Sequence, residues 1–393
     1  MTRKERGINL VFLLGLLLFL LIGLCRTIFW PKTMNYYENR YAHTIEAPSP
    51  GSIWSSAFQD SMERALSDQV TFSGTMKSAY HRISNTFQVY ATKGFVAKHP
   101  DMYITLLGQY IFGGEHLVYG PVWLSDFTEK LDQRIQNLNY IIDKNPSISF
   151  FVYYIEKDTD VDFVTGRDAG VSAYLEENLQ LPDGHFGEFL VNDFATFQRN
   201  FYRTDHHWNC YGSYLGYTQV LRLLDPSAEA MVPVEEVLLP QSFSGSKAAT
   251  VGAEGILQEQ FPAYRFDYPP MDITINGKPA EDYGNQAAYL NGTADGHIGY
   301  GAFYGGDMGE IVFQTHPEGK DNILVIGESY DNAILKLLAS HYDNTYSVDL
   351  RYYEAANGKP FHFSQYVQEH DISTVLLIGN MDFFRMDDFA LED

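Results

Sequence analysis

The chain has 393 residues, of which 45% are hydrophobic, enough to bury a sizeable core in one large domain or two smaller ones. It contains 27 lysines and arginines against 50 aspartates and glutamates, which gives a formal net charge of −23. Such a charge argues against nucleic acid as a partner, because phosphate binding needs a basic surface. It suits a domain that meets neutral polymers.

The N-terminal region predicts a membrane anchor. Residues 1–7 form a short tail with Arg3, Lys4 and Arg6, and residues 8–30 are dominated by leucine and phenylalanine. At 1.5 Å per residue this run approaches the roughly 30 Å hydrocarbon core of a bilayer. A cleaved signal peptide would need a shorter apolar region and a small-residue cleavage site, and we find neither. We expect an uncleaved, single-pass signal anchor in the cell membrane, with a cytoplasmic N-terminus and an extracellular body.

Residues 31–95 are expected to form a linker and stalk helices. Proline, glycine and serine interrupt the first part, to about residue 55, and apolar residues at helical spacing follow from Trp54 to Tyr90. The chain has two cysteines, Cys25 and Cys210, and we expect no disulfide within the exported part.

Residues 96–393 predict an extracellular α/β domain. A helical stretch from Leu124 to Asp143 leads into an apolar strand, Ser149–Ile155, and a β-rich insertion with hairpins is expected over residues 240–320. The C-terminal part reads as βαβαβ and so predicts a parallel sheet with helices on both faces. Its elements are the strand 323–326, the helix 332–341, the strand 346–350, the helix 364–369 and the strand 374–378.

An Asp-x-His pair comes directly before a predicted helix that Asn209 can cap and that ends before Pro226. Asp205 can orient the imidazole of His207 and stabilise its charged form, which is half of a nucleophilic catalytic site. The plainer alternative is a capping aspartate beside a surface histidine. Trp208, the next residue, is either a platform for a sugar ring or a core residue.

A metal site is a further alternative. Asp205, His206 and His207 could bind a metal ion together with His297 or His316. Metal ligands must converge in the fold, however, and the chain has no H-E-x-x-H or C-x-x-C spacing. We therefore expect neither a metal nor another cofactor.

Ser329 is the candidate for the activated serine. It follows Gly327 at the carboxyl end of a predicted strand, where ligands gather in open parallel sheets. The N–H groups of the next helix would then be directed at the oxyanion that forms when a serine attacks an ester. Alternatively, Ser329 is an ordinary helix N-cap.

The segment Thr204–Trp208, with the sequence TDHHW, resembles the motif that names the DHHW protein family of Gram-positive bacteria. This family is related to the alginate O-acetyltransferase group, whose domains are similar to SGNH hydrolases. The resemblance implies an SGNH-hydrolase-like fold with Asp205, His207 and Ser329 as the catalytic set. Further similar blocks are Glu38–Arg40, Asp68–Gln69, Tyr154–Asp158 and Asp349–Tyr353.

Two positions depart from the pattern of the related group. Glu328 replaces the aspartate of Gly-Asp-Ser, and the oxyanion asparagine has a match only in Asn380, within Gly379–Asp382. Asn380, Trp208 and Arg351 are the candidate oxyanion or substrate-binding residues.

The resemblance implies an anchored O-acyltransferase, probably one for acetyl groups, or an esterase, that modifies a cell-surface polysaccharide with a membrane-bound O-acyltransferase as partner. The alternative is a non-catalytic polysaccharide-binding or scaffold protein of the cell envelope.

Overall fold

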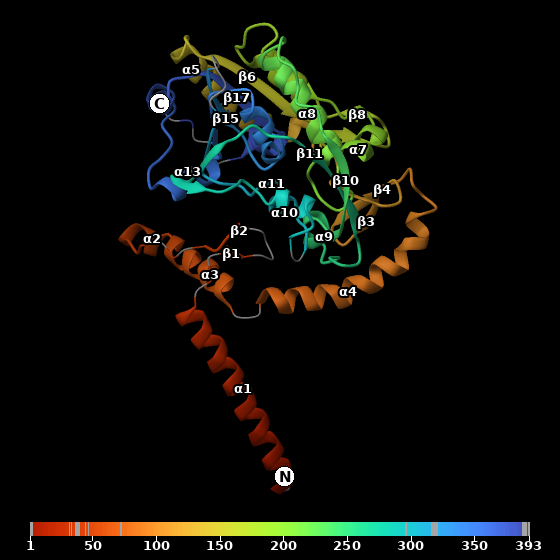
Figure 1. Cartoon of the computed structure of the whole chain (residues 1–393). Helices are drawn as coiled ribbons and strands as arrows, with labels where there is room; N and C mark the ends of the chain where they lie inside the picture. The colour runs from red at the N-terminus through yellow and green to blue at the C-terminus, as the bar shows by residue number, and fades with distance from the viewer. Residues whose placement is uncertain are drawn as a thin grey trace. The chain divides into compact units, whose positions relative to one another are not determined.

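The computed structural model describes residues 3–30, 32, 34–35, 40–43, 45, 47–70, 73–294, 297–315, 321–386 and 391. The chain divides into two compact units, Met1–Tyr90 with Ala249–Ala253, and Ala91–Ala248 with Glu254–Asp393 (Figure 1). Glu38, Asn39 and His316, which the sequence analysis named, lie outside the described residues.

The first unit is mainly helical. The expected anchor, residues 8–30, coincides with the helix α1 as far as Phe29, yet no helix among the residues that the structure describes combines the length and apolar character needed to cross a membrane. Cys25 of this unit and Cys210 of the other are both free thiols. The elements are α1 (Arg3–Phe29), β1 (Met34–Asn35), β2 (Arg40–Tyr41), α2 (Pro50–Trp54), α3 (Ala57–Gln69) and α4 (Ser73–Val96), which continues into the second unit.

The second unit is built on an eight-stranded sheet with the order β13-β12-β14-β16-β15-β17-β6-β9. The five strands from β16 to β9 are parallel, and β14, β12 and β13 extend the sheet in antiparallel pairs. The bounds are β6 (Ser149–Ile155), β9 (Phe186–Phe189), β12 (Asp272–Ile275), β13 (Lys278–Ala280), β14 (Glu310–Gln314), β15 (Asn322–Ile326), β16 (Asn344–Val348) and β17 (Ile372–Gly379).

The β-rich region is therefore not a separate insertion, because three of its strands belong to the main sheet. It also begins before residue 240, at Glu235, where β10 (Glu235–Phe243) forms a hairpin with β11 (Glu259–Arg265). The strand expected at 346–350 ends at Val348, since Asp349 caps the helix α13 (Leu350–Asn357). Smaller sheets are β3 (Ile104–Leu106) with β4 (Gln109–Phe112) and β5 (His116–Val118), and β7 (Val161–Asp162) with β8 (Arg167–Asp168).

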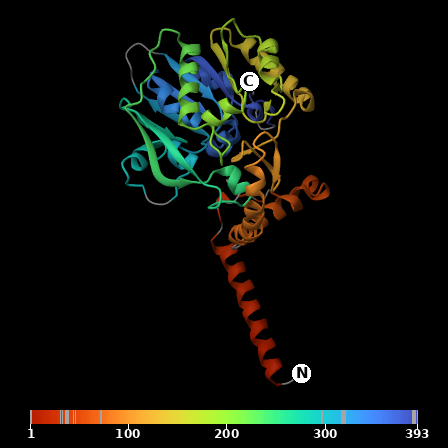
Figure 2. The same ribbon diagram turned by 90° about the vertical axis from the view of Figure 1, so that its right-hand side faces the viewer.

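Helices cover both faces of the sheet, as the sequence predicts (Figure 2). Along β6, Phe151 and Tyr153 share one core with α8, whereas Phe150 and Val152 share the opposite core with α5. This alternation follows from the two-residue period of a strand. The first face carries α7 (Phe194–Asn200), α8 (Cys210–Leu224), α10 (Gln286–Leu290), α11 (Tyr300–Tyr304) and α12 (Leu335–Ala339); the other carries α5 (Thr128–Lys144), α6 (Val171–Asn178), α13, α14 (Phe363–Glu369) and α15 (Met381–Arg385).

The strand order places several polar segments at one edge of the sheet. After β15 the chain passes to β16 on one side and then returns to β17 on the other. The carboxyl ends beside such a switch point form a crevice in open α/β sheets. Ser329 follows β15, Asp349 follows β16, Asn380 follows β17 and Lys157 follows β6. The topology therefore gathers segments that lie far apart in the sequence.

Candidate active site

The Asp-x-His motif lies in a tight loop between α7 and α8. A single antiparallel bridge pairs Phe201 with Trp208, and the N–H of Tyr202 donates to the carbonyl of His207. Asn209 caps α8, since its Oδ1 accepts from the first N–H groups of that helix. The bridge and the cap together hold both ends of the loop. The Asn209 cap agrees with the sequence prediction.

Asp205, His207 and Ser329 form one hydrogen-bonded series. The Oδ1 atom of Asp205 lies 2.6 Å from His207 Nδ1, and His207 Nε2 lies 2.7 Å from Ser329 Oγ. The N–H of His207 also donates to Asp205 Oδ1, at 2.9 Å. A carboxylate can only accept, so Nδ1 carries the hydrogen and Nε2 is free to accept from the serine hydroxyl.

The Asp205 carboxylate is buried and fully supported. Its Oδ2 accepts from the N–H of Ser246, at 2.7 Å. Burial alone would raise the pKa of this carboxyl, but the imidazoles of His207 and His206 and the hydrogen bonds hold it well below its usual range. Asp205 is therefore a fixed negative charge beside His207.

Packing fixes the plane of the His207 ring. Its ring stacks on that of Tyr300, with centroids 3.7 Å apart and planes 1° apart. The side chain of His207 is buried, so few other rotamers are open to it. Its alignment with Ser329 is thus set by the fold and does not depend on a ligand.

His206 points to a different partner. Its Nδ1 lies 2.5 Å from Ser246 Oγ, and its carbonyl accepts from the Tyr330 hydroxyl. Burial, followed by the neighbouring His207, holds the pKa of His206 well below its ordinary value. Of the two histidines, it is His207 that contacts Ser329.

Ser329 is not a helix N-cap. The helix expected at 332–341 is divided into a 3-10 turn, η2 (Asp331–Ala333), and α12, and neither has a side-chain cap hydrogen bond. The expected array of helix N–H groups at the serine is therefore shorter than the sequence indicates. Gly327 leaves room for the buried Asp331 side chain, because a Cβ atom there would lie 2.2 Å from an Asp331 oxygen.

Glu328 and Asn380 form a buried pair beside Ser329. Asn380 Nδ2 donates to Glu328 Oε1 at 2.6 Å, and Asn380 Oδ1 accepts from the N–H of Asp382 and so caps α15. Burial raises the pKa of Glu328 to about 7, against the opposing charges of Arg351 and Lys157. One of the two amide hydrogens of Asn380 is thus used to hold Glu328.

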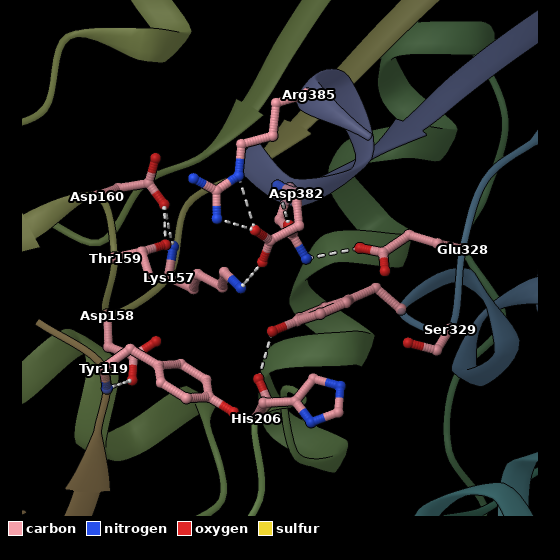
Figure 3. A network of polar contacts seen from close by, with 12 residues as sticks. Tyr119, Lys157, Asp158, Thr159, Asp160, His206, Glu328, Ser329, Asp382 and Arg385 are labelled. Atoms are coloured by element: carbon pink, nitrogen blue, oxygen red, sulfur yellow. Dashed lines mark hydrogen bonds and ion pairs between the residues drawn. The ribbon is translucent and has the colours of Figure 1, made fainter. Parts of the chain in front are cut away.

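Two ion pairs fix the backbone around this edge of the sheet. Lys157 Nζ lies 2.5 Å from an oxygen of Asp382, whose other oxygen binds Arg385 (Figure 3). Lys247 Nζ lies 2.5 Å from Asp158 Oδ2, and both side chains are 0% exposed. The second pair joins the end of β6 to the residue after Ser246, and so supports the contact between Ser246 and Asp205.

Two candidate substrate-binding residues have other contacts. Trp208 is fully buried, and its Nε1 donates to the carbonyl of Tyr330, so it is a core residue and cannot stack on a sugar. The guanidinium of Arg351 is bound by Asp349 and by Asp307. Its charge is therefore already paired within the protein.

The ligand atoms of Asp205, His206 and His207 lie within 4.8 Å of one another, as a metal site would require. The same atoms take part in the hydrogen bonds with Ser329 and Ser246. A metal ion would have to displace those bonds, because each imidazole nitrogen has one lone pair or one hydrogen to offer.

Sequence reasoning did not identify Ser246, Tyr300 or Lys247. All three reach the site through contacts between segments distant in the chain, which leave no local pattern. The neighbouring Gly245 does leave a trace in the sequence. A Cβ atom there would lie 2.3 Å from the Cβ of Asp205, so only glycine fits at this position.

No family model matches the sequence, and no curated protein matches it. Solved structures do match. A DHHW family protein from Eubacterium siraeum has 14% identity and a TM-score of 0.57, over 74% of this chain and 98% of that one. The chain has the fold of a DHHW family protein. Bacillus cereus PatB1, solved with a sulfonyl adduct, has 19% identity and a TM-score of 0.52, over 71% of this chain and 98% of its own. The O-acetyltransferase domain of Pseudomonas putida AlgJ matches more distantly, with 11% identity and a TM-score of 0.34, over 70% and 94% of the two chains.

Proposed function

We propose that this protein is an O-acyltransferase, or an esterase, that acts on a cell-surface polysaccharide through Ser329. The observation that carries the proposal is the hydrogen-bonded series from Asp205 through His207 to Ser329. An aspartate, an imidazole and a hydroxyl in this order form the arrangement that activates a serine nucleophile. The fold shared with a DHHW family protein supports the proposal.

The first half-reaction forms an acyl-enzyme. Ser329 Oγ attacks the carbonyl carbon of an acyl donor while His207 Nε2 takes the hydroxyl proton. The Asp205 carboxylate stabilises the imidazolium. His207 then gives the proton to the leaving oxygen of the donor. Asn380 is proposed as an oxyanion donor through the amide hydrogen that Glu328 does not take.

The second half-reaction decides between transfer and hydrolysis. A hydroxyl group of the polysaccharide, or water, attacks the acyl carbonyl and loses its proton to His207. The bond between the acyl carbon and Ser329 Oγ then breaks, and Oγ takes the proton back from His207. A bound sugar competes with water because positioning supplies a large effective molarity.

The setting of this reaction is part of the proposal. Arg3, Lys4 and Arg6, which precede the expected membrane segment, favour a cytoplasmic N-terminus and an extracellular body. An acyl donor made in the cytoplasm would then need a membrane-bound O-acyltransferase to carry the acyl group across. Protease added outside intact cells should digest the body; complete protection in cells whose wall admits the protease would contradict this topology.

The deciding experiment is labelling of the full chain with an aryl sulfonyl fluoride. Ser329 Oγ should displace fluoride and form a sulfonate ester, detected as a single adduct on the Ser329 peptide by mass spectrometry. PatB1, which shares the fold, has been solved with a sulfonyl adduct. Ser329→Ala should give no adduct, while Ser340→Ala, a matched change of a partly exposed serine elsewhere, should label like wild type.

Equal labelling of wild type and Ser329→Ala would contradict the assignment of the nucleophile. Absence of labelling and of ester turnover, together with retained polysaccharide binding, would favour the non-catalytic binding or scaffold function.

A further inference from the structure

A cavity of about 930 Å³ lies beside the loop that carries Asp205 and His207. Residues on either side of that pair line it, including Arg203 and Asn209, together with both strands of the β10–β11 hairpin. Among the residues that the structure describes, Asp205, His207 and Ser329 do not line this cavity. Its volume is in the range that binds small molecules, and it is distinct from the serine site.

A β-bulge shapes the cavity. Leu239 pairs with Phe261, but the next paired residue of β10 is Ser242, opposite Gln260. Pro240 and Gln241 therefore have no partner on β11, and both line the cavity. Bulges of this kind redirect side chains and are common next to functional sites.

The cavity presents uncharged polar groups. In the part of the chain that the structure describes, the side-chain amides of Gln198, Gln241 and Gln260 make no hydrogen bond, and the Oε1 atom of Gln241 is buried. His116, which is 1% exposed, also lines the cavity, and both of its ring nitrogens lack a partner. The amides of Gln198 and Gln260 are exposed, so they can exchange their hydrogen bonds to water for hydrogen bonds to a ligand.

The charged groups of the cavity are already neutralised. Arg203 forms an ion pair with Glu115. Glu259 accepts from the N–H of Arg203 at 2.9 Å, and from the N–H and the hydroxyl of Thr204. A charged ligand would have to displace these contacts, whereas a neutral one would not.

We propose that this cavity binds a neutral, hydroxyl-rich oligosaccharide segment, namely a stretch of the acceptor polysaccharide. Amide groups both donate to and accept from sugar hydroxyls, and the half-buried Tyr211 in the lining supplies aromatic surface for a sugar ring. The identity of this ligand as the acceptor rests on the proposed function. The cavity would hold the chain next to the catalytic loop while another of its units reaches Ser329.

Glu259 in the cavity lining is connected to Asp205 through a series of hydrogen bonds. Glu259 holds Thr204, whose hydroxyl accepts from the N–H of Gly245 at 3.0 Å. The next N–H, of Ser246, donates to Asp205. A bound segment therefore lies against the network that positions Asp205.

The test is calorimetric titration of the full chain with three neutral hexasaccharides, of N-acetylglucosamine, glucose and mannose, and with a charged hexagalacturonate. At least one neutral hexamer should bind and the charged one should not. Gln241→Ala and Gln260→Ala should each weaken binding about threefold to tenfold, the worth of one neutral hydrogen bond. Gln365→Ala, a change of an exposed glutamine on α14 that lies outside the cavity lining, should leave binding unchanged.

Failure of all three neutral hexamers to bind, or binding that the Gln241 and Gln260 variants do not weaken although they unfold at the wild-type temperature, would overturn the proposal. Sulfonyl labelling separates it from the proposed function. If the protein is labelled at Ser329 but binds no neutral hexasaccharide, only the proposal for the cavity is refuted. If the protein binds a neutral hexasaccharide, with loss of affinity in Gln241→Ala, but is not labelled, only the proposed catalytic function is refuted.

Discussion

His207 Nε2 lies 2.7 Å from Ser329 Oγ, although 122 residues separate the two along the chain. The contact forms because the loop before α8 and the end of β15 meet at one edge of the sheet. The Asp205 contact on the other side of the imidazole and the stacked ring of Tyr300 hold His207 in this orientation. A serine hydroxyl aligned in this way is ready to lose its proton in place, without a prior rearrangement.

Removing the Ser329 hydroxyl and removing the Asp205 carboxylate should lower the rate of catalysis by different amounts. We expect Ser329→Ala to abolish turnover of a chromogenic acyl ester. Asp205→Asn should lower kcat by about 10³-fold to 10⁴-fold and leave a residual rate, because oxyanion donors and binding remain. Steady-state kinetics on the purified chain measure both. Turnover by Ser329→Ala at the wild-type rate would refute the nucleophile.

The two adjacent histidines provide an internal control. His207→Gln should lose activity to nearly the same extent as Ser329→Ala, because groups that act as a unit are not additive. His206→Gln should retain activity within about tenfold, the effect expected when one supporting hydrogen bond, that to Ser246, is lost. The opposite ranking of the two variants would assign the base to His206.

The parts of the fold with a strong local pattern could be predicted from the sequence. The strand Ser149–Ile155 agrees with prediction residue for residue, and the helix after Asn209 has the expected cap and end. The strands from Ile323 and Thr374 were predicted within the observed β15 and β17.

The errors concern features that depend on tertiary contacts. Nothing in the local sequence shows that β12, β13 and β14 join the main sheet, since pairing between distant strands is set by the core that they share. The helix after Ser329 is broken at Ile334, which is buried, and packing rather than helix propensity decides its shape.

The buried ion pair between Lys247 and Asp158 should be critical for stability. Lys247→Met leaves the Asp158 carboxylate buried without its counter-charge, so the free energy of unfolding should fall by about 3–5 kcal/mol. In Lys247→Met/Asp158→Asn, the amide oxygen can still accept from the N–H of Tyr119 and no charge is stranded. Urea unfolding should therefore show the double variant to be more stable than the single one; equal or lower stability would contradict this account.

Removal of metal should leave ester turnover unchanged. The imidazole nitrogens of His207 are both engaged by Asp205 and Ser329, so catalysis as proposed uses no metal ligand. The assay is turnover after dialysis against EDTA, with and without added Zn²⁺. Excess Zn²⁺ is expected to inhibit, because it would compete for the clustered ligand atoms of Asp205, His206 and His207. Loss of activity on chelation and its return with Zn²⁺ would instead support the metal alternative.

Glu328, which precedes Ser329 in the chain, should make stability depend on pH. Its pKa is raised by burial from an ordinary value of 4.5 to about 7, so between these values the folded protein keeps a proton that the unfolded chain releases. Stability therefore falls as pH rises from about 4.5 to about 7 and changes no further above that. Glu328→Gln stays neutral throughout and can still accept from Asn380. Relative to wild type, Glu328→Gln should gain stability across this window, by at most roughly 3 kcal/mol.

Urea unfolding at pH 5 and pH 8 measures this difference in stability, with the exposed Glu177→Gln as control. A gain that is the same at both pH values, or larger at pH 5, would show that Glu328 is not held protonated by the fold.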